Sequence, residues 1–294
     1  MIMKYFSALI IVCSLSLPNF SHAQAQDEYR SYLLKIIANL QAQITLLQAQ
    51  LDEQSTQISK LNTDFESFIL PDSAQIFERY QISNVDAVSL IADDNNRMFF
   101  KRFFSIVPDA YDDDITELVV FTDEEEGIDA FVETVPSQKG LKWRFGISSE
   151  VFKYPVQDKA TSELFVHEFA HILSYAPVPT VSISGPTTCH KYFDGFGCPP
   201  EDSYFVAFLD EYWSDNDLDN LIDFGTNAWS SSEQKYYFVS TYAATAPEED
   251  FAESFAQFVL ETRQSNTTVA KQKINFFYQY PELVKMRNEI RSNL

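Results

Sequence analysis

A heptad repeat of apolar residues runs from about residue 30 to residue 65 and contains neither proline nor glycine. One seam of the repeat is apolar throughout, at Ile37, Ile44, Leu51, Ile58 and Phe65. The other seam is leucine with a single glutamine, at Leu33, Leu40, Leu47, Gln54 and Leu61. Such a stretch folds as a long helix with one apolar edge, and isoleucine at one seam with leucine at the other favours a parallel two-stranded coiled coil. The sequence therefore predicts a coiled coil over residues 27–66 that makes a homodimer or small oligomer. The alternative is a helix that packs back on its own domain.

The first residues have the arrangement of an export signal. Lys4 is the only charged residue before an apolar run at residues 5–17, and the small residues Ser21 and Ala23 then provide a cleavage site. The run is too short to cross a bilayer comfortably. We expect a signal peptide over residues 1–23, a secreted or periplasmic mature protein, and no stable membrane span after cleavage. The alternative is an uncleaved segment that remains in the membrane as an anchor.

Cleavage of that signal leaves two cysteines, Cys189 and Cys198. Two cysteines so close together in an exported protein are expected to form a disulfide. Closing such a short loop would stabilise the fold by about 2–3 kcal/mol. The alternative is a metal site that these cysteines share with His190, but no fourth ligand stands at a usual spacing.

Residues 72–294 are expected to form one folded domain, because the chain is rich in Phe and Tyr and has only 7 Gly. Short apolar or alternating runs predict strands at residues 86–92, 116–122, 131–135 and 142–147. Helical periodicity follows at residues 161–175, 202–214 and 249–262. Strands followed by helices indicate an α+β domain.

The formal net charge of -22 restricts the partners of the chain. A strongly acidic protein repels nucleic acid and acidic membrane surfaces, so no nucleic acid is expected as a partner. The acidity is explained either by solubility in a salty or extracellular setting or by a preference for cationic substrates.

The predicted helix at residues 161–175 contains the segment His167-Glu168-Phe169-Ala170-His171. Histidines four residues apart project from one face of a helix, so both imidazoles can bind one zinc ion. Glu168 lies beside them and can take a proton from a water activated by the zinc. The match is specific because the mature chain has only three histidines. The alternative is a pair of histidines that are merely hydrogen-bonded within a helix.

A catalytic zinc also needs a third protein ligand and one open position. Glu249 and Glu253 stand one turn apart on the predicted helix that follows Pro247, where acidic residues suit the N-terminal end. We expect Glu249 to bind the zinc and Glu253 to hold a ligand histidine. Ala252 and Ala256 would leave room on that face for a neighbouring helix and the metal, with phenylalanines on the opposite face. The alternative is an acidic helix cap followed by an ordinary amphipathic helix.

Together the two motifs resemble the gluzincin metallopeptidases, and most of all the branch that contains the anthrax lethal factor catalytic domain and the Pro-Pro endopeptidases. In that branch a tyrosine stands seven residues before the glutamate ligand and an acid stands four residues after it. Tyr242 and Glu253 stand at these positions relative to Glu249. The chain also resembles exported bacterial zinc-binding peptidases that carry a similar EDFAESFA segment. The resemblance covers roughly the second half of the chain and is sharp only in the two motifs.

This resemblance implies a zincin-like metallopeptidase domain over residues 72–294 and hydrolysis of a peptide or protein substrate. It implies one Zn²⁺ per chain, bound by His167, His171 and Glu249. It makes Glu168 the general base, Tyr242 the donor to the transition-state oxyanion, and Glu253 the support of a ligand histidine. Zincin folds align an extended peptide on an edge strand, so we expect residues 142–147 to form that edge.

Two other functions stay open beside the peptidase, and one stretch of the chain suggests a calcium site. The chain could be a non-catalytic envelope protein in which the coiled coil is the working part and the zincin-like domain only binds peptide or metal. The complete set of catalytic residue types argues against this reading. Hydrolysis of a non-peptide amide is a further alternative. A stretch at residues 215–220 resembles the start of a calcium loop but lacks its central Gly and its final Glu.

The coiled coil can be tested by light scattering. The protein without its signal peptide should be a dimer or small oligomer, because the apolar seam of residues 30–65 is poorly covered in an isolated helix. A form that begins after residue 66 should be monomeric. A monomeric longer form would show instead that the helix packs on its own domain.

Overall fold

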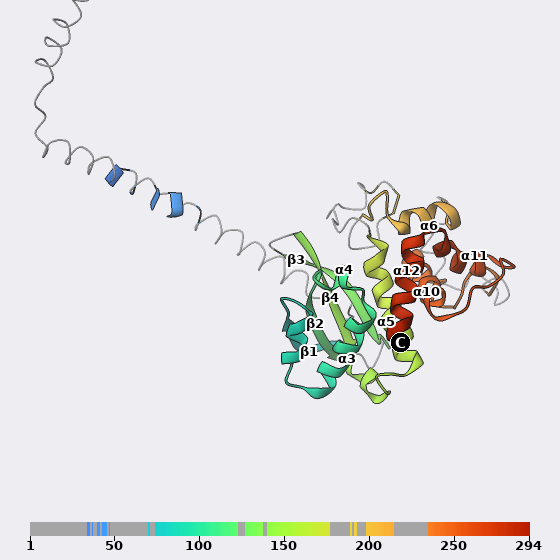
Figure 1. The fold of residues 1–294 in the computed structure, drawn as a ribbon, viewed down its shortest axis with the longest axis horizontal. Helices are drawn as coiled ribbons and strands as arrows, with labels where there is room; N and C mark the ends of the chain where they lie inside the picture. Colours follow the sequence, from blue (N-terminus) through green and yellow to red (C-terminus); the bar gives the residue numbers. More distant parts are fainter. Residues whose placement is uncertain are drawn as a thin grey trace, which may run out of the picture. The chain divides into compact units, whose positions relative to one another are not determined.

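The structure of the chain is a computed structural model (Figure 1). It describes residues 70, 74–122, 127–137, 140–176, 189, 191–192, 198–214 and 235–294, together with scattered positions between 34 and 47. The signal peptide, most of the coiled-coil segment, His190 and the calcium-like stretch at 215–220 lie outside the described residues. The contacts divide the chain into two units, Met1–Lys60 and Leu61–Leu294, which are described separately.

In the first unit the described positions between 34 and 47 are all helical. Their apolar side chains are 49–63% exposed, at Leu34, Ile37, Leu40, Ile44 and Leu47. A helix that pairs with another in a coiled coil leaves its apolar residues exposed when one chain is considered alone, as is the case here. The coiled coil itself stays a prediction. Among the described residues, no helix combines the length and the hydropathy that a transmembrane span needs.

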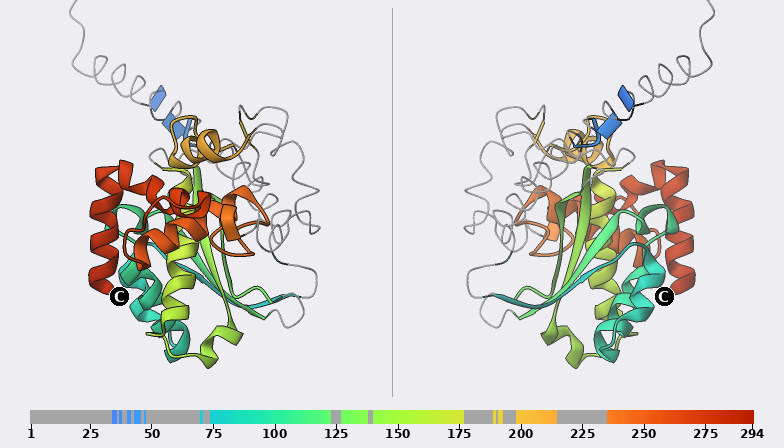
Figure 2. Two further views of the ribbon diagram at one scale, coloured as in Figure 1. Left: turned by 90° about the vertical axis from the view of Figure 1, so that its right-hand side faces the viewer. Right: turned by 90° about the vertical axis from the view of Figure 1, so that its left-hand side faces the viewer.

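A four-stranded mixed sheet forms one layer of the second unit (Figure 2). Its strands are β1 (Gln75–Gln81), β2 (Ile115–Thr122), β3 (Ala130–Ser137) and β4 (Gly140–Ser148), in the spatial order β1-β2-β4-β3. β2 and β4 are parallel, and the other neighbouring pairs are antiparallel. The strands predicted at 116–122, 131–135 and 142–147 are confirmed, whereas β1 is not among the predicted strands.

The strand predicted at residues 86–92 is wrong, because this segment contains the 3₁₀ helix η1 (Val85–Leu90). The side chain of Asn84 caps its start by accepting a hydrogen bond from a backbone N–H three residues later. A 3₁₀ helix repeats every three residues, and Val88 and Ile91, three apart, are accordingly buried. In so short a segment this spacing is easily confused with the alternation of a strand.

The prediction that residues 142–147 form an edge strand is also wrong. β4 lies between β2 and β3, so β3 is the edge on that side of the sheet. Side chains on both faces of β4 are buried, which is typical of an interior strand. Its buried Arg144 lies 2.6 Å from both Glu117 of β2 and Glu133 of β3, which compensates the charge.

Two helices, α3 (Asp94–Ile106) and α5 (Lys159–Ser174), cover one face of the sheet. Both pack on Phe145 of β4, since the Phe103 ring stacks on it at 3.7 Å and the Phe165 ring meets it edge-on at 5.8 Å. The helix predicted at residues 161–175 is therefore confirmed as α5. α3 is a helix that the sequence analysis does not predict.

The C-terminal helices lie on the other side of α5 from the sheet (Figure 1). They are α6 (Tyr204–Tyr212), α10 (Pro247–Leu260), α11 (Val269–Phe276) and α12 (Pro281–Asn293). The predicted helices at residues 202–214 and 249–262 correspond to α6 and α10. The sheet, its covering helices and this helical layer make an α+β domain, as predicted.

The helix α10 has two buried faces. Ala252 and Ala256 are at most 1% exposed and lie in the helix that packs along α5. The phenylalanines contact the ring of Phe277 with centroids 5.2–5.4 Å apart, and they are Phe251, Phe255 and Phe258. The phenylalanines thus pack on the C-terminal helical layer as predicted, but Phe255 also meets Phe169 of α5 with centroids 6.2 Å apart, so the phenylalanine face is not confined to the side away from α5.

Cys189 and Cys198 form a disulfide, as predicted from their spacing. Tyr192, which stands between the two cysteines in the sequence, contacts the C-terminal helical layer, where its ring meets Phe205 of α6 edge-on at 6.0 Å.

An ion pair between Asp250 of α10 and Lys273 of α11 is enclosed within the helical layer. The two groups are 2.5 Å apart, and their side chains are 0% and 3% exposed. Asp250 also accepts a hydrogen bond of 3.0 Å from the Trp213 indole, and the Lys273 ammonium lies 4.1 Å from the centre of the Phe238 ring. Each charge is therefore compensated although water is excluded.

Replacing Lys273 with Met should lower the free energy of unfolding by about 3–5 kcal/mol, because it leaves the Asp250 carboxylate buried without its cation. The double variant Asp250→Asn, Lys273→Met should recover part of that loss. The control is Lys153→Met, whose side chain is 69% exposed in its pair with Glu150 and which should cost less than about 1 kcal/mol. Urea unfolding measures all three. Equal losses for Lys273→Met and the control would contradict the importance of the buried pair.

Candidate metal centre

The first two candidate ligands project from the middle of α5. The helix begins after Asp158, whose side chain accepts a hydrogen bond from the Ala160 N–H. Because His167 and His171 are one turn apart, their rings lie on one face with centroids 4.9 Å apart. The Nε2 atoms of the two rings are 3.1 Å apart. The sequence spacing thus places two imidazole nitrogens close enough to share one ion.

Glu249 completes the cluster from the first turn of α10, which begins at Pro247. Its Oε2 atom lies 3.0 Å from Nε2 of His167 and 3.5 Å from Nε2 of His171. This oxygen is buried and accepts no well-directed hydrogen bond. Among the described residues, these three make up the group of histidine, cysteine and acidic side chains that could hold a metal ion.

The spacing of these three atoms fits a zinc ion. Nitrogen and oxygen ligands bound tetrahedrally to zinc at their usual bond lengths lie about 3.3–3.4 Å from one another. The three observed separations are 3.0, 3.1 and 3.5 Å. Buried polar atoms normally have a hydrogen-bond partner, and Oε2 of Glu249 has none among the described residues. Such an oxygen is expected where a carboxylate binds a metal ion. The donor set and its geometry therefore suit Zn²⁺.

Glu253 lies one turn along α10 and holds His167 from its other side. Its Oε1 atom is 2.8 Å from Nδ1 of His167. Since an ionised carboxylate can only accept, Nδ1 is the donor, and this contact sets the orientation of the ring. Burial alone would raise the pKa of Glu253, but the contact with His167 outweighs burial and lowers it.

The charges around the two histidines favour a cation in the site. Burial alone would lower the pKa of His167, but the carboxylates of Glu249 and Glu253 raise it to about 10. The pKa of His171 is also raised, mainly by Glu249 acting against burial. The same histidines depress the pKa of Glu249 well below its usual range despite its burial. Imidazoles surrounded by carboxylates bind either protons or a metal ion.

Glu168 lies between the cluster and the edge of the sheet. Its side chain is almost completely buried, and burial raises the pKa of its carboxyl, although both histidines and a hydrogen bond from the Val132 backbone lower it. Val132 belongs to the edge strand β3. A carboxylate with a raised pKa is a stronger base than an exposed one, which suits proton transfer near neutral pH.

Tyr242 reaches the cluster from the turn that precedes α10. Its ring is 53% exposed, and the ring centre lies 5.8 Å from that of His167. Burial of its hydroxyl raises the pKa of Tyr242 above the ordinary value of a tyrosine, and the negative charges of Glu249 and Glu168 raise it further. The hydroxyl is therefore protonated at neutral pH and can donate a hydrogen bond.

The structure brings together all six predicted side chains of the metal and catalytic site, which are His167, Glu168, His171, Tyr242, Glu249 and Glu253. Two neighbours of the site were not predicted. Tyr192 donates a 2.9 Å hydrogen bond to Glu248, directly before the ligand Glu249. The backbone of Val132 contacts Glu168. A backbone donor leaves no mark in the sequence, and only its position beside Cys189 distinguishes Tyr192.

Comparison of the chain with protein-family models, with curated proteins and with solved structures gives no match. The function is therefore inferred from the site itself.

The purified protein should bind one zinc ion per chain, measured by elemental mass spectrometry after dialysis. His167→Ala should abolish this binding because it removes a ligand from the centre of the cluster. Glu253→Gln should keep the stoichiometry but weaken the affinity by about 10–100-fold, because it loosens the His167 ring. Stoichiometric zinc in the His167→Ala protein would place the metal site elsewhere.

Proposed function

We propose that this chain is an exported zinc-dependent endopeptidase with a gluzincin-like zincin domain preceded by a coiled coil. The observation that carries the proposal is the convergence of two imidazole nitrogens and one carboxylate oxygen within 3.0–3.5 Å. Three protein ligands of this kind leave one position open, as catalytic zinc sites do. Closed structural zinc sites use four protein ligands.

Each side chain around the cluster has a role in such a reaction. A zinc ion bound by His167, His171 and Glu249 supplies a Lewis acid that polarises a carbonyl group and makes water more acidic. Glu168 takes a proton from the attacking water, and its burial beside the histidines keeps it basic enough for this task. It can then pass that proton to the leaving amine.

Tyr242 and Glu253 act on charge and orientation. The Tyr242 hydroxyl, which is protonated, would donate a hydrogen bond to the oxyanion that develops on the attacked carbonyl. Glu253 keeps the proton of His167 on Nδ1, so that Nε2 presents its lone pair to the metal.

An extended peptide is the substrate that this architecture favours. Glu168 lies against the backbone of Val132, so the proton-accepting group sits directly beside the edge strand β3. A strand at the edge of a sheet offers unpaired backbone groups, and a peptide that pairs with them would be held in line with the base. The expected peptide-aligning strand is thus β3 and not residues 142–147.

Export is supported by two features of the chain. A disulfide such as Cys189–Cys198 is typical of proteins from oxidising compartments. The apolar N-terminal run with its small-residue cleavage site provides the signal. The proposed location is therefore secreted or periplasmic.

Glu168→Gln should retain zinc and lose nearly all cleavage of a mixed peptide library, because glutamine keeps the shape but cannot accept a proton. Tyr242→Phe should lower kcat by roughly 10- to 1000-fold with little change in KM or zinc content. The matched control is Glu163→Gln, the same change on α5 at a residue that contacts Gln257 of α10. It should leave both zinc and rate unchanged.

Peptide cleavage at the wild-type rate by the Glu168→Gln protein would exclude this mechanism. If zinc-loaded wild-type protein cut no peptide but hydrolysed small amides, the substrate would be a non-peptide amide. If it cut neither, a non-catalytic binding protein would be the better description.

A further inference from the structure

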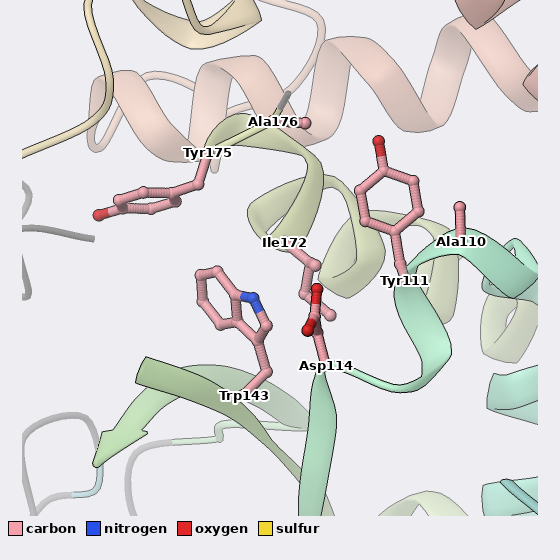
Figure 3. A pocket seen from close by; sticks show the side chains of 7 residues that line it. All are labelled: Ala110, Tyr111, Asp114, Trp143, Ile172, Tyr175 and Ala176. Atoms are coloured by element: carbon pink, nitrogen blue, oxygen red, sulfur yellow. The ribbon is translucent and has the colours of Figure 1, made fainter. Parts of the chain in front are cut away.

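A cavity lies at the C-terminal end of α5, the helix that carries His167 and His171 (Figure 3). Its volume is about 280 Å³. The residues that line it come from α4 (Asp109–Asp112), the starts of β2 and β4, and the end of α5, and they are Ala110, Tyr111, Asp114, Trp143, Ile172, Tyr175 and Ala176. Ile172 and Tyr175 follow Glu168 and His171 by four residues each, so the cavity lies about one helical turn beyond the metal cluster. The residues proposed for the metal and for catalysis do not line it.

Three aromatic rings form most of the wall. Figure 3 shows Trp143 and Tyr175 on one side of the cavity and Tyr111 on the other. Trp143 and Tyr175 are at most 8% exposed, and their rings meet edge-on with centroids 5.5 Å apart. Tyr111 is held in place by Phe169 of α5, whose ring lies 5.3 Å away. The described part of the wall is therefore rich in aromatic rings, whose π faces attract organic cations.

Among the described residues that line the cavity, Asp114 is the charged one, and its carboxylate lies between Trp143 and Tyr111 (Figure 3). One of its oxygens pairs with the ammonium of Lys142, which does not line the cavity. Within the described part of the chain, the second oxygen has no hydrogen-bond partner. A carboxylate oxygen thus remains as an acceptor for a ligand in a space whose described lining is mainly aromatic and aliphatic, with the hydroxyls of Tyr111 and Tyr175 and the indole N–H of Trp143 as its other polar side-chain groups.

We propose that this cavity binds a primary alkylammonium group. The ammonium would donate a hydrogen bond to the second oxygen of Asp114, the aromatic rings would surround the charge, and the alkyl stem would contact Ile172. The volume is below that of most drug-sized ligand pockets, so it suits a side chain or a small amine. Further acids in the same short segment, Asp109, Asp112 and Asp113, add negative charge near Asp114. An anionic ligand is disfavoured for the same reason.

The test uses n-butylammonium, with n-butanol as the neutral molecule of matched size. The chain has three Trp, so ¹⁵N-labelling of tryptophan gives three indole resonances, and Trp143→Phe identifies that of Trp143. Butylammonium should shift the Trp143 resonance saturably, and butanol should bind at least tenfold more weakly. Equal affinity for the two probes would show a purely apolar pocket and overturn the proposal.

Two variants test the role of the carboxylate. Asp114→Asn should weaken butylammonium binding at least tenfold. The matched control Asp109→Asn, an acid of the same segment that does not line the cavity, should change the affinity less than twofold. Equal weakening by both would indicate a general effect of net charge and contradict the proposal. Lys142→Met keeps Asp114 and removes its competing cation, so it should tighten binding at least twofold, and weaker binding would also contradict the proposal.

Peptides then identify the source of the ammonium group. Two peptides are compared, one with a single lysine and one with norleucine in its place. Displacement of butylammonium by the lysine peptide alone would identify a lysine side chain as the occupant. Displacement by neither peptide, with binding of butylammonium retained, would identify a free amine. The measurement needs no turnover, so it succeeds or fails independently of the proposed peptidase activity.

Discussion

The packing of α5 against α10 is the contact on which the candidate metal centre depends. α5 supplies both histidines, and α10 supplies Glu249 and Glu253, so neither helix has a complete ligand set alone. Ala252 and Ala256 are buried and, by helical geometry, lie on the side of α10 that carries Glu249 and Glu253, where a residue with no side chain beyond Cβ permits a close approach of the helices. A larger residue at either position would separate the two helices, and the carboxylates would lose contact with the imidazoles.

Both neighbours of the candidate ligand Glu249 along the chain are held by other parts of the domain. The residue before it, Glu248, accepts a hydrogen bond from Tyr192 in the disulfide segment. The residue after it, Asp250, is held by Lys273 and by the Trp213 indole. The start of α10 is therefore attached to three other parts of the domain before any ion binds. Such preorganisation lowers the entropy that a ligand must lose on coordination, and it gives the buried Asp250–Lys273 pair a function in addition to charge compensation.

The sequence predicts best those parts of the site that follow from local spacing. Histidines four apart on a helix and acids four apart on another need only the helical repeat, and both arrangements are found in the structure. The pairing of the two helices is not local, and its prediction depended on the need of a catalytic zinc for a third protein ligand, to which the resemblance between motifs was then added. The contact of Glu168 with Val132 could not be predicted because it involves a backbone group.

The wrong predictions about the fold likewise concern features that local spacing does not determine. The position of β4 in the interior of the sheet is decided by its partners β2 and β3, and its own apolar pattern is equally compatible with an edge. β1 was missed because its alternate residues are exposed and its middle holds two consecutive charged residues, Glu78 and Arg79, so no apolar run marks the strand. Three further helices, α3, α11 and α12, were not predicted. The phenylalanine-rich α3 has a helical signal that more complete use of the 3.6-residue period would have found.

The charge balance of the centre links its metal affinity to the stability of the domain. Three carboxylates, those of Glu168, Glu249 and Glu253, surround two imidazoles in a largely buried space. Without a cation their mutual repulsion would oppose the approach of α10 to α5, and a proton on His167, with its pKa of about 10, relieves only part of it. A divalent ion can replace that proton and add one further positive charge at the same place. Metal binding should therefore release a proton and stabilise the contact between the two helices, since an ion that binds only the folded chain shifts the unfolding equilibrium.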